Sequence, residues 1–516
     1  MRSARLHALQ WFPALTALAY VVTVAVLSRG LVHGLFWDPD VAGPFVLGDR
    51  LRGHGPVYIP HYGQWTLLWS LLATRDLPGH ATLWEALGYP FAVAGAALVG
   101  WAGWRLSGRW AGVTAAAVAL VVGPFALRSQ LSAVYHVTTP FTAALLGAYL
   151  VQLARRAPAG GVRRRSLALA LLVGVIAGAN AASDALLWPA GIAPFAVASV
   201  VLLAGTRSKQ IAIRAGLALA ATVTSALATI GLMRFLDFHV VGLEVHPVHL
   251  SGLAANVRQL GRMVALLAGA NYALPGGYPP EPLRIVLALL AVAALAACVV
   301  AAFRHFRRGS EPVVRAYACY WAASIVFLAV TFTATTNAVS LGAGSVNYLL
   351  TFPLAAGAGA ALLASGSRGA RLGVAAAVAL VGATNIAGIV AGHADTPRGA
   401  IGKYERPIVR RLEELDATHG YAGYWDAHNL TWQSGMHVLA APVSTCGSTL
   451  CGHTFTTIAS WYTERHRRSF LLADASNAFA PPPSVVRDAS ASYRFGPLTL
   501  YVFAYDLSRS IRPPRP

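Results

Sequence analysis

Long apolar runs alternate with short polar segments over most of the first 392 residues. A run of about 17 to 25 apolar residues crosses the roughly 30 Å hydrocarbon core of a bilayer as one helix. The pattern therefore predicts about eleven transmembrane helices. We expect them at about 10–33, 84–104, 110–127, 137–154, 166–184, 187–205, 212–233, 283–303, 316–335, 346–365 and 371–392.

The composition supports the same class. The chain has 516 residues, of which 56% are hydrophobic and 12% are charged, whereas a soluble domain carries about 25% charge. We therefore predict an all-α polytopic membrane protein with a small C-terminal extracytoplasmic α/β domain. Lysine is nearly absent, while alanine, glycine and arginine abound, which is typical of GC-rich bacterial coding.

The net charge of +20 does not indicate nucleic-acid binding, because the arginines fall in short clusters between apolar runs and do not form one basic face. Positive clusters in alternate loops mark the cytoplasmic side of a membrane. With a retained first helix and a cytoplasmic N-terminus, all five clusters become cytoplasmic, and an odd helix count puts the tail outside. The clusters are Arg105 and Arg109; Arg155, Arg156 and 163–165; Arg207, Lys209 and Arg214; Arg304, Arg307, Arg308 and Arg315; and Arg368 and Arg371.

The expected organisation is a transmembrane module over 1–392, with outer loops 34–83 and 234–282, and an extracytoplasmic domain over 393–516. The tail pattern predicts a helix over 402–417. It also predicts strands at 421–425, 437–441, 469–472 and 498–503. Cys446 and Cys451 lie close together in a polar segment, and outside the cytoplasm such a pair forms a disulfide.

Within loop 234–282, apolar residues recur at helical spacing between 248 and 267. This pattern is typical of a helix that lies in the membrane interface. A short soluble helix packed under the tail fits the same pattern, and both interpretations stay open.

Two carboxylates, Asp38 and Asp40, follow the first helix directly, separated by Pro39. One interpretation is structural: Asp38 caps a short helix that has Pro39 in its first position. The other is functional, because acidic residues at membrane depth are costly and usually serve a function. In that case one carboxylate faces a cavity and acts as a base or as a ligand of a divalent cation, Mg or Mn. Capping would hold the same carboxylate in place, so the two interpretations are compatible.

Further polar residues gather at the expected outer ends of the helices. Each alone fits a capping or snorkelling role, but together they predict an outward-facing polar cavity. Its arginines and histidines are residue types that bind phosphate. The predicted donor-phosphate and substrate-binding residues are Arg128, His136, Asp184, Arg234, His246, His249, Asn347 and Tyr348. The chain contains no P-loop, zincin motif or serine nucleophile elbow.

The layout resembles the GT-C superfamily of integral-membrane glycosyltransferases, which use polyprenyl-phosphate-linked sugars. The resemblance rests on the retained first helix, the acidic stretch Trp37-Asp38-Pro39-Asp40, the helix count and the outer C-terminal domain. It implies that Asp38 or Asp40 is the catalytic base or a metal ligand, and that the sugar is transferred with inversion. The Asp-Glu pair and tyrosine of dolichyl-mannosyltransferases are missing. The WWD-like signature of oligosaccharyltransferases is also absent, and Tyr424-Trp425-Asp426 is the nearest stretch.

We therefore expect an inverting glycosyltransferase in the bacterial inner membrane. It would move a sugar from a polyprenyl-phosphate carrier to a glycan, lipid or protein acceptor of the cell envelope, with membrane lipids as its other partners. A phosphate leaving group needs no general acid, so one carboxylate that deprotonates the acceptor hydroxyl suffices. The main alternative is a polytopic transporter or lipid-linked-glycan flippase. A membrane scaffold that displays the tail and an O-antigen ligase or polymerase are further alternatives.

Overall fold

The computed structural model describes residues 11–33, 39–50, 55–60, 88–132, 136–155, 164–241, 246–270, 278–335, 339, 342–365, 367–395, 405–475 and 479–514. The chain divides into two compact units. The first, here called the membrane unit, comprises 1–30, 86–230 and 244–395. The second, here called the C-terminal unit, comprises 31–85, 231–243 and 396–516. Parts of both expected outer loops therefore cluster with the tail.

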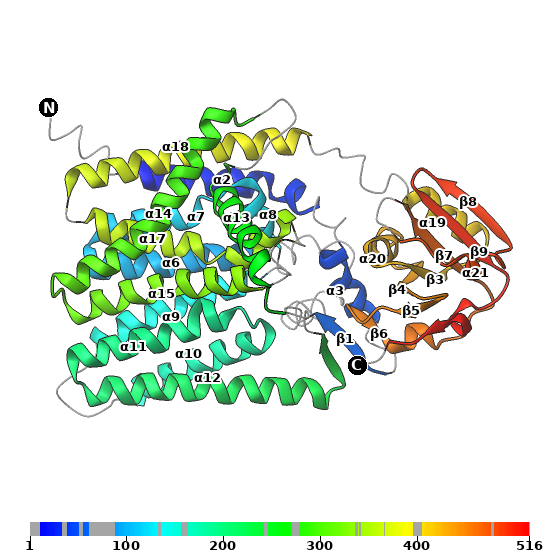
Figure 1. The fold of residues 1–516 in the computed structure, drawn as a ribbon, viewed down its shortest axis with the longest axis horizontal. Helices are drawn as coiled ribbons and strands as arrows, with labels where there is room; N and C mark the ends of the chain where they lie inside the picture. Colours follow the sequence, from blue (N-terminus) through cyan, green and yellow to red (C-terminus); the bar gives the residue numbers. More distant parts are fainter. Residues whose placement is uncertain are drawn as a thin grey trace. The chain divides into compact units, whose positions relative to one another are not determined.

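The membrane unit is helical (Figure 1). Its helices are α2 (Phe12–His33), α6 (Gly88–Ser107), α7 (Arg109–Leu120), α8 (Pro124–Leu131), α9 (Thr138–Arg155), α10 (Arg164–Ser183), η2 (Trp188–Ile192), α11 (Ala193–Thr206), α12 (Lys209–Phe235), α13 (Leu250–Leu267), α14 (Glu281–Arg307), α15 (Pro312–Ala334), η3 (Gly342–Leu349), α17 (Phe352–Ala364) and α18 (Arg368–Asp395). Among the described residues, six helices are long and apolar enough to cross a membrane, or seven if one bent pair counts as a span. The chain is thus a multi-pass membrane protein. Every predicted run overlaps one of these helices, and the total of eleven spans stays a prediction.

The predicted single span at 110–127 is wrong in one respect. It consists of α7 and α8, which are bent by 90° at their junction. Pro124 begins α8 and has no N–H to continue the helix. Gly123 allows a close approach to the end of α13, since a Cβ there would lie 2.5 Å from the Leu266 carbonyl oxygen. The Gly123 N–H donates to the carbonyl of Leu267 at 2.7 Å.

The tail contains a seven-stranded sheet in the order β10-β5-β4-β3-β7-β9-β8. Central strand β3 is parallel to β4 and β7, and the remaining pairs are antiparallel except β10-β5. This confirms the small α/β domain. The strands are β3 (His419–Gly423), β4 (Leu439–Cys446), β5 (Thr449–Gly452), β7 (Ser469–Asp474), β8 (Ala491–Phe495), β9 (Leu498–Phe503) and β10 (Ile511–Arg512), and the helices are α19 (Glu405–Glu414), α20 (Tyr424–Gln433) and the short α21 (Pro483–Val486).

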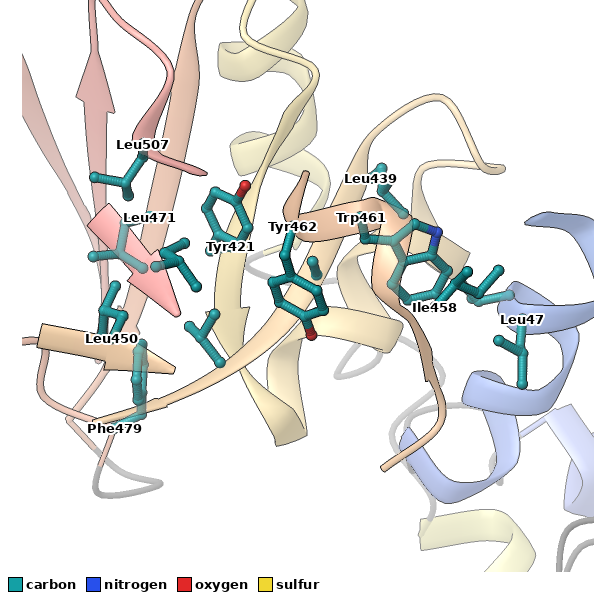
Figure 2. Packing of buried hydrophobic residues seen from close by; sticks show 14 of the residues in the cluster. Leu47, Tyr421, Leu439, Leu450, Ile458, Trp461, Tyr462, Leu471, Phe479 and Leu507 are labelled. Atoms are coloured by element: carbon teal, nitrogen blue, oxygen red, sulfur yellow. The ribbon is translucent and has the colours of Figure 1, made fainter. Parts of the chain in front are cut away.

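An apolar cluster covers each face of the central strands of this sheet, and successive side chains along a strand alternate between the two faces. On β3, Tyr421 belongs to one apolar cluster and Ala422 to the other, and Leu471 and Leu472 of β7 divide in the same way. The cluster with Tyr421 and Leu471 extends to Ile458, Trp461 and Tyr462 (Figure 2). The predicted disulfide is confirmed: Cys446, the last residue of β4, is bonded to Cys451 of β5.

The first outer loop is built into the C-terminal unit. Strand β1 (Val57–Pro60) pairs in parallel with β2 (Phe238–Val241) and antiparallel with β6 (Thr457–Ile458), so one sheet joins three distant parts of the chain. Helix α3 (Pro39–Arg50) packs against α20. In Figure 2, Leu47 of α3 lies beside Ile458 and Trp461 at the edge of the tail cluster.

Candidate functional site

The two predicted carboxylates lie at the start of α3. Asp38 lies outside the described residues, and Asp40 is in the first turn of α3, where its side chain is not described. The expectation of a short helix with Pro39 in its first position is confirmed. Residues 42–48 of that helix are all buried, and the ring centroids of Phe45 and Trp432 are 5.7 Å apart. The segment that bears the carboxylates is therefore held by the C-terminal unit.

A second group of predicted residues forms a buried polar cluster in the membrane unit. His136 Nδ1 lies 2.8 Å from Asp184 Oδ2, and both side chains are buried. The Thr139 hydroxyl donates to the same carboxylate oxygen at 2.5 Å, and the Leu186 N–H donates to Asp184 Oδ1 at 3.0 Å. Beside them, Thr138 donates to Asn180 Oδ1 at 2.7 Å. Asp184 thus orients a histidine ring at the end of α10.

The electrostatics of this cluster favour an ionised Asp184. Burial alone would raise the pKa of its carboxyl group. The charge of His136, together with the hydrogen bonds from His136, Thr139 and the Leu186 N–H, more than offsets burial and lowers the pKa below its ordinary value. The carboxylate therefore carries its charge at neutral pH and fixes the position of the imidazole.

The predicted pair Asn347 and Tyr348 joins the same cluster. Ser129 of α8 donates a hydrogen bond to Asn347 Oδ1 in η3, and the rings of His136 and Tyr348 have centroids 5.0 Å apart. Next to these residues in the chain, Gln130 Oε1 and Ser183 Oγ are buried without a hydrogen-bond partner in the described part of the protein. Buried polar groups normally have hydrogen-bond partners, so these two atoms are candidates to bind a polar ligand or water.

The remaining predicted residues are placed differently. Arg128 precedes Ser129 on α8 and its guanidinium lies 5.8 Å from the Phe125 ring centroid. Arg234 is exposed on the last turn of α12, in the part assigned to the C-terminal unit. His246 and His249 are exposed ahead of α13. Ser129 and Thr139 are not among the predicted residues. Ser129 directly follows the predicted Arg128, and Thr139 lies shortly after the predicted His136.

An apolar cavity of about 440 Å³ lies between α7, α13, α14, α17 and α18. All its lining side chains are apolar, from Val122 and Pro353 at one end to Ala364 and Gly373 at the other. Because a helix rises about 1.5 Å per residue, the stretch of α17 along it is about 18 Å long. Along the chain, Ser129 follows the lining residue Val122 across the bend between α7 and α8, and Tyr348 precedes the lining residue Phe352. The segment from α7 to α8 and the segment from η3 to α17 thus each contribute residues both to the polar cluster and to the lining of the apolar cavity.

The C-terminal unit has a separate group of buried titratable side chains on and near α20. Burial raises the pKa of Asp426 to about 7, and the charges of Asp474 and Glu405 add to this effect. Burial, followed by the charge of His453, lowers the pKa of fully buried His428 to about 3. The rings of Tyr424 and His453 stack with centroids 5.0 Å apart. The stretch Tyr424-Trp425-Asp426 therefore begins a helix near two histidines, His428 and His453, whose pKa values burial lowers.

No family model and no curated protein matches the chain. Solved structures do match. ArnT from Cupriavidus metallidurans bound to undecaprenyl phosphate is 12% identical, with a TM-score of 0.54, over 93% of this chain and 97% of that one. Its apo form matches equally. The chain therefore shares the fold of these ArnT structures. The oligosaccharyltransferase of Archaeoglobus fulgidus, complexed with Zn and sulfate, is 15% identical over 83% of this chain and 62% of that one, with a TM-score of 0.45.

The sequence predicts a candidate metal site at Asp38 and Asp40. In the described part of the chain, no group of three or more His, Cys, Asp or Glu residues is placed to hold a metal ion. Asp38 and the Asp40 side chain are outside that description, so the divalent cation stays a prediction and no chemical step is assigned to it.

Proposed function

We propose that this GT-C-fold protein is an inverting glycosyltransferase that moves a sugar from a polyprenyl-phosphate carrier to a glycan, lipid or protein acceptor on the outer face of the membrane. The observations that carry the proposal are the buried polar cluster around His136 and Asp184 and the apolar cavity in the same unit. Such a site suits an amphipathic ligand with a polar head and a long hydrocarbon chain. The ArnT structure with the same fold is bound to undecaprenyl phosphate, which has that chemistry.

The residues divide the chemistry between the two units. The carboxylate of Asp38 or Asp40 removes the proton from the acceptor hydroxyl, whose oxygen attacks the anomeric carbon as the bond to the carrier phosphate breaks. The phosphate leaves as an anion and needs hydrogen-bond donors and cations where its charge develops. The proposed sources in the cluster and beside it are Arg128, His136, Asn347 and Tyr348. Asp184 orients His136, and the predicted set is completed by Arg234, His246 and His249.

The deciding experiment compares Asp38→Asn and Asp40→Asn with the wild type. Because the neutral amide cannot accept a proton, we expect one of them to lower kcat by about 10² to 10⁴-fold while expression is unchanged. The measurement is glycoside formation from undecaprenyl-phosphate-linked sugars in reconstituted membranes. Asp416→Asn, at an exposed position, is the matched control. Full activity in both variants would remove the assigned base.

A transporter or flippase predicts a different result in the same membranes. Transporters use broken helices, and the bent pair α7–α8 is one such feature. If the protein moves lipid-linked sugar across the bilayer without forming a glycoside, the transport interpretation replaces this proposal.

A further inference from the structure

Helix α3 touches the tail at a position where no side chain fits. A Cβ atom added to Gly43 would lie 2.8 Å from Thr456 Cγ2 and 3.2 Å from His428 Cδ2. The first of these distances is shorter than Cβ contacts in folded proteins. Gly43 is therefore required for α3 to lie as closely as it does on α20 and on the turn before β6.

The surface beneath Gly43 is unusually constrained. Thr456 is buried and has a φ of +54°, a conformation that a β-branched residue rarely adopts. Such strain persists only where the surrounding structure enforces it, and it concentrates at functional sites. The next residues, 457–458, form β6 and pair with β1. The turn at Thr456 therefore contacts α3 and leads into β6. Strand β6 in turn pairs with β1, the strand that follows α3 in the chain.

His428 completes this surface. Its side chain is fully buried, and neither ring nitrogen has a hydrogen-bond partner among the described residues. A buried imidazole without partners carries a cost, so a role beyond the stability of α20 would account for it. Its ring supplies a flat, uncharged surface against the backbone of α3 at Gly43.

We propose that His428 and Thr456 are positioning residues for the acid-bearing turn of α3, so that the C-terminal unit sets where the catalytic carboxylate lies. Gly43 is three residues after Asp40 in the same helix, so a shift at Gly43 moves the first turn with it. A displacement of about 1 Å at a reacting group can cost about 10²-fold in rate. The inference rests on the proposed function, because it assumes that Asp38 or Asp40 is the base.

The test is a rescue experiment with Gly43→Ala. The added methyl group must push α3 away from Thr456 Cγ2, so we expect kcat to fall at least tenfold while KM for the lipid-linked donor is unchanged. Adding Thr456→Ser removes that Cγ2 atom, and we expect the double variant to recover to within a few-fold of the wild type. Gly231→Ala, where no atom lies within 4 Å of the added Cβ, is the control and should match the wild type.

Hydrogen–deuterium exchange over residues 39–50 gives a readout that does not depend on activity. We expect faster exchange in Gly43→Ala and restored protection in the double variant. Wild-type kcat in Gly43→Ala, or a double variant that stays as slow as the single one, would overturn the positioning role. If the wild type forms no glycoside, the proposed function fails, while the exchange data still show whether Thr456 holds α3.

Discussion

At the scale of single residues, Asp184 is the carboxylate whose charge is best explained by its contacts. Asp184→Asn keeps the shape of the side chain but removes the charge that His136 and Thr139 contact. Net contributions of hydrogen bonds to charged groups are about 1.5–3 kcal/mol, and we expect the free energy of unfolding to fall by about that amount. Unfolding in mild detergent, followed by tryptophan fluorescence, measures the change.

The chain offers a matched control for this variant. Asp237 and His239 form a second Asp–His pair at 3.0 Å, but both side chains are substantially exposed. Exposed pairs contribute about 0–1 kcal/mol, so Asp237→Asn should change stability little. Equal losses in the two variants would contradict the importance of burial at Asp184.

The lowered pKa of Asp184 also sets the pH dependence of this difference. A carboxyl group with a lower pKa in the folded state stabilises the protein above its unfolded pKa, near 3.9, and this stabilisation is lost as the pH falls through the folded value. We therefore expect a constant stability gap between the wild type and Asp184→Asn from pH 7 to about pH 5, and a narrowing gap below about pH 4. A gap that widens in acid would have the wrong sign.

Much of this cluster could be predicted from residue type and position. Polarity at a helix end is the signal that predicts His136, Asp184, Asn347 and Tyr348, and the structure brings these four together. Ser129 and Thr139 were missed because a hydroxyl at a helix end is usually a cap. Only the distance to a buried carboxylate or amide identifies such a hydroxyl as part of a site.

At the scale of elements, α13 has three different faces. Asn256 and Gln259 are buried and donate to the carbonyls of Thr335 and Gly342, at 2.6 and 2.5 Å. Leu250 and Val257, on a second face, are 90% and 53% exposed. A third face carries the exposed Ser251, Arg258 and Arg262. A helix anchored by its polar side, with apolar and basic faces exposed, fits the membrane interface.

This arrangement predicts where a spin label on α13 meets lipid. In a background with Cys298→Ala and Cys319→Ala, we expect a label at Val257→Cys to be accessible to oxygen, because that face enters the acyl region. A label at Ser251→Cys should be accessible to a water-soluble nickel chelate instead. Electron paramagnetic resonance in nanodiscs measures both. Equal nickel accessibility at the two positions would favour a helix in water over one in the interface.

The elements themselves were largely predictable, and their pairing was not. Hydrophobic periodicity predicts the membrane helices, α19 and the strands β3, β4, β7 and β9, because a 3.6- or 2-residue repeat is a local property. The predicted strand 421–425 is wrong at its end, since α20 begins at Tyr424, and α20 itself was not predicted. Pro124 carried the signal for the break between α7 and α8. The pairing of β1 with β6 joins residues about 400 positions apart, and no local pattern reports a contact of that range.

At the scale of the whole molecule, the division of the chain is less simple than a membrane module followed by a tail. The described parts of the first outer loop and the end of α12 belong with residues 396–516. The residues proposed to activate the acceptor therefore fold with the tail, whereas the cluster proposed to hold the carrier phosphate folds with the membrane helices. The proposed set of residues is therefore divided between the two units.

The same division makes the side of the membrane on which the tail lies decisive for the proposed chemistry. The arginine clusters predict that residues 393–516 are outside the cytoplasm, where the Cys446–Cys451 disulfide is stable. Cys451→Ser leaves Cys446 as a free thiol in the tail. We expect a membrane-impermeant maleimide to label it in intact spheroplasts, while the wild type is labelled there only after reduction.

The control is a thiol on the opposite side. Ser208 lies between α11 and α12, next to the predicted cytoplasmic residues Arg207 and Lys209. In a Cys446→Ser/Cys451→Ser background, Ser208→Cys should be labelled only after the cells are lysed. If Cys446 were labelled only after lysis and Ser208→Cys were labelled in intact spheroplasts, the tail would be cytoplasmic. Because α3 folds with the tail, the carboxylates at its start would then be on the same side, and transfer on the outer face would have no base.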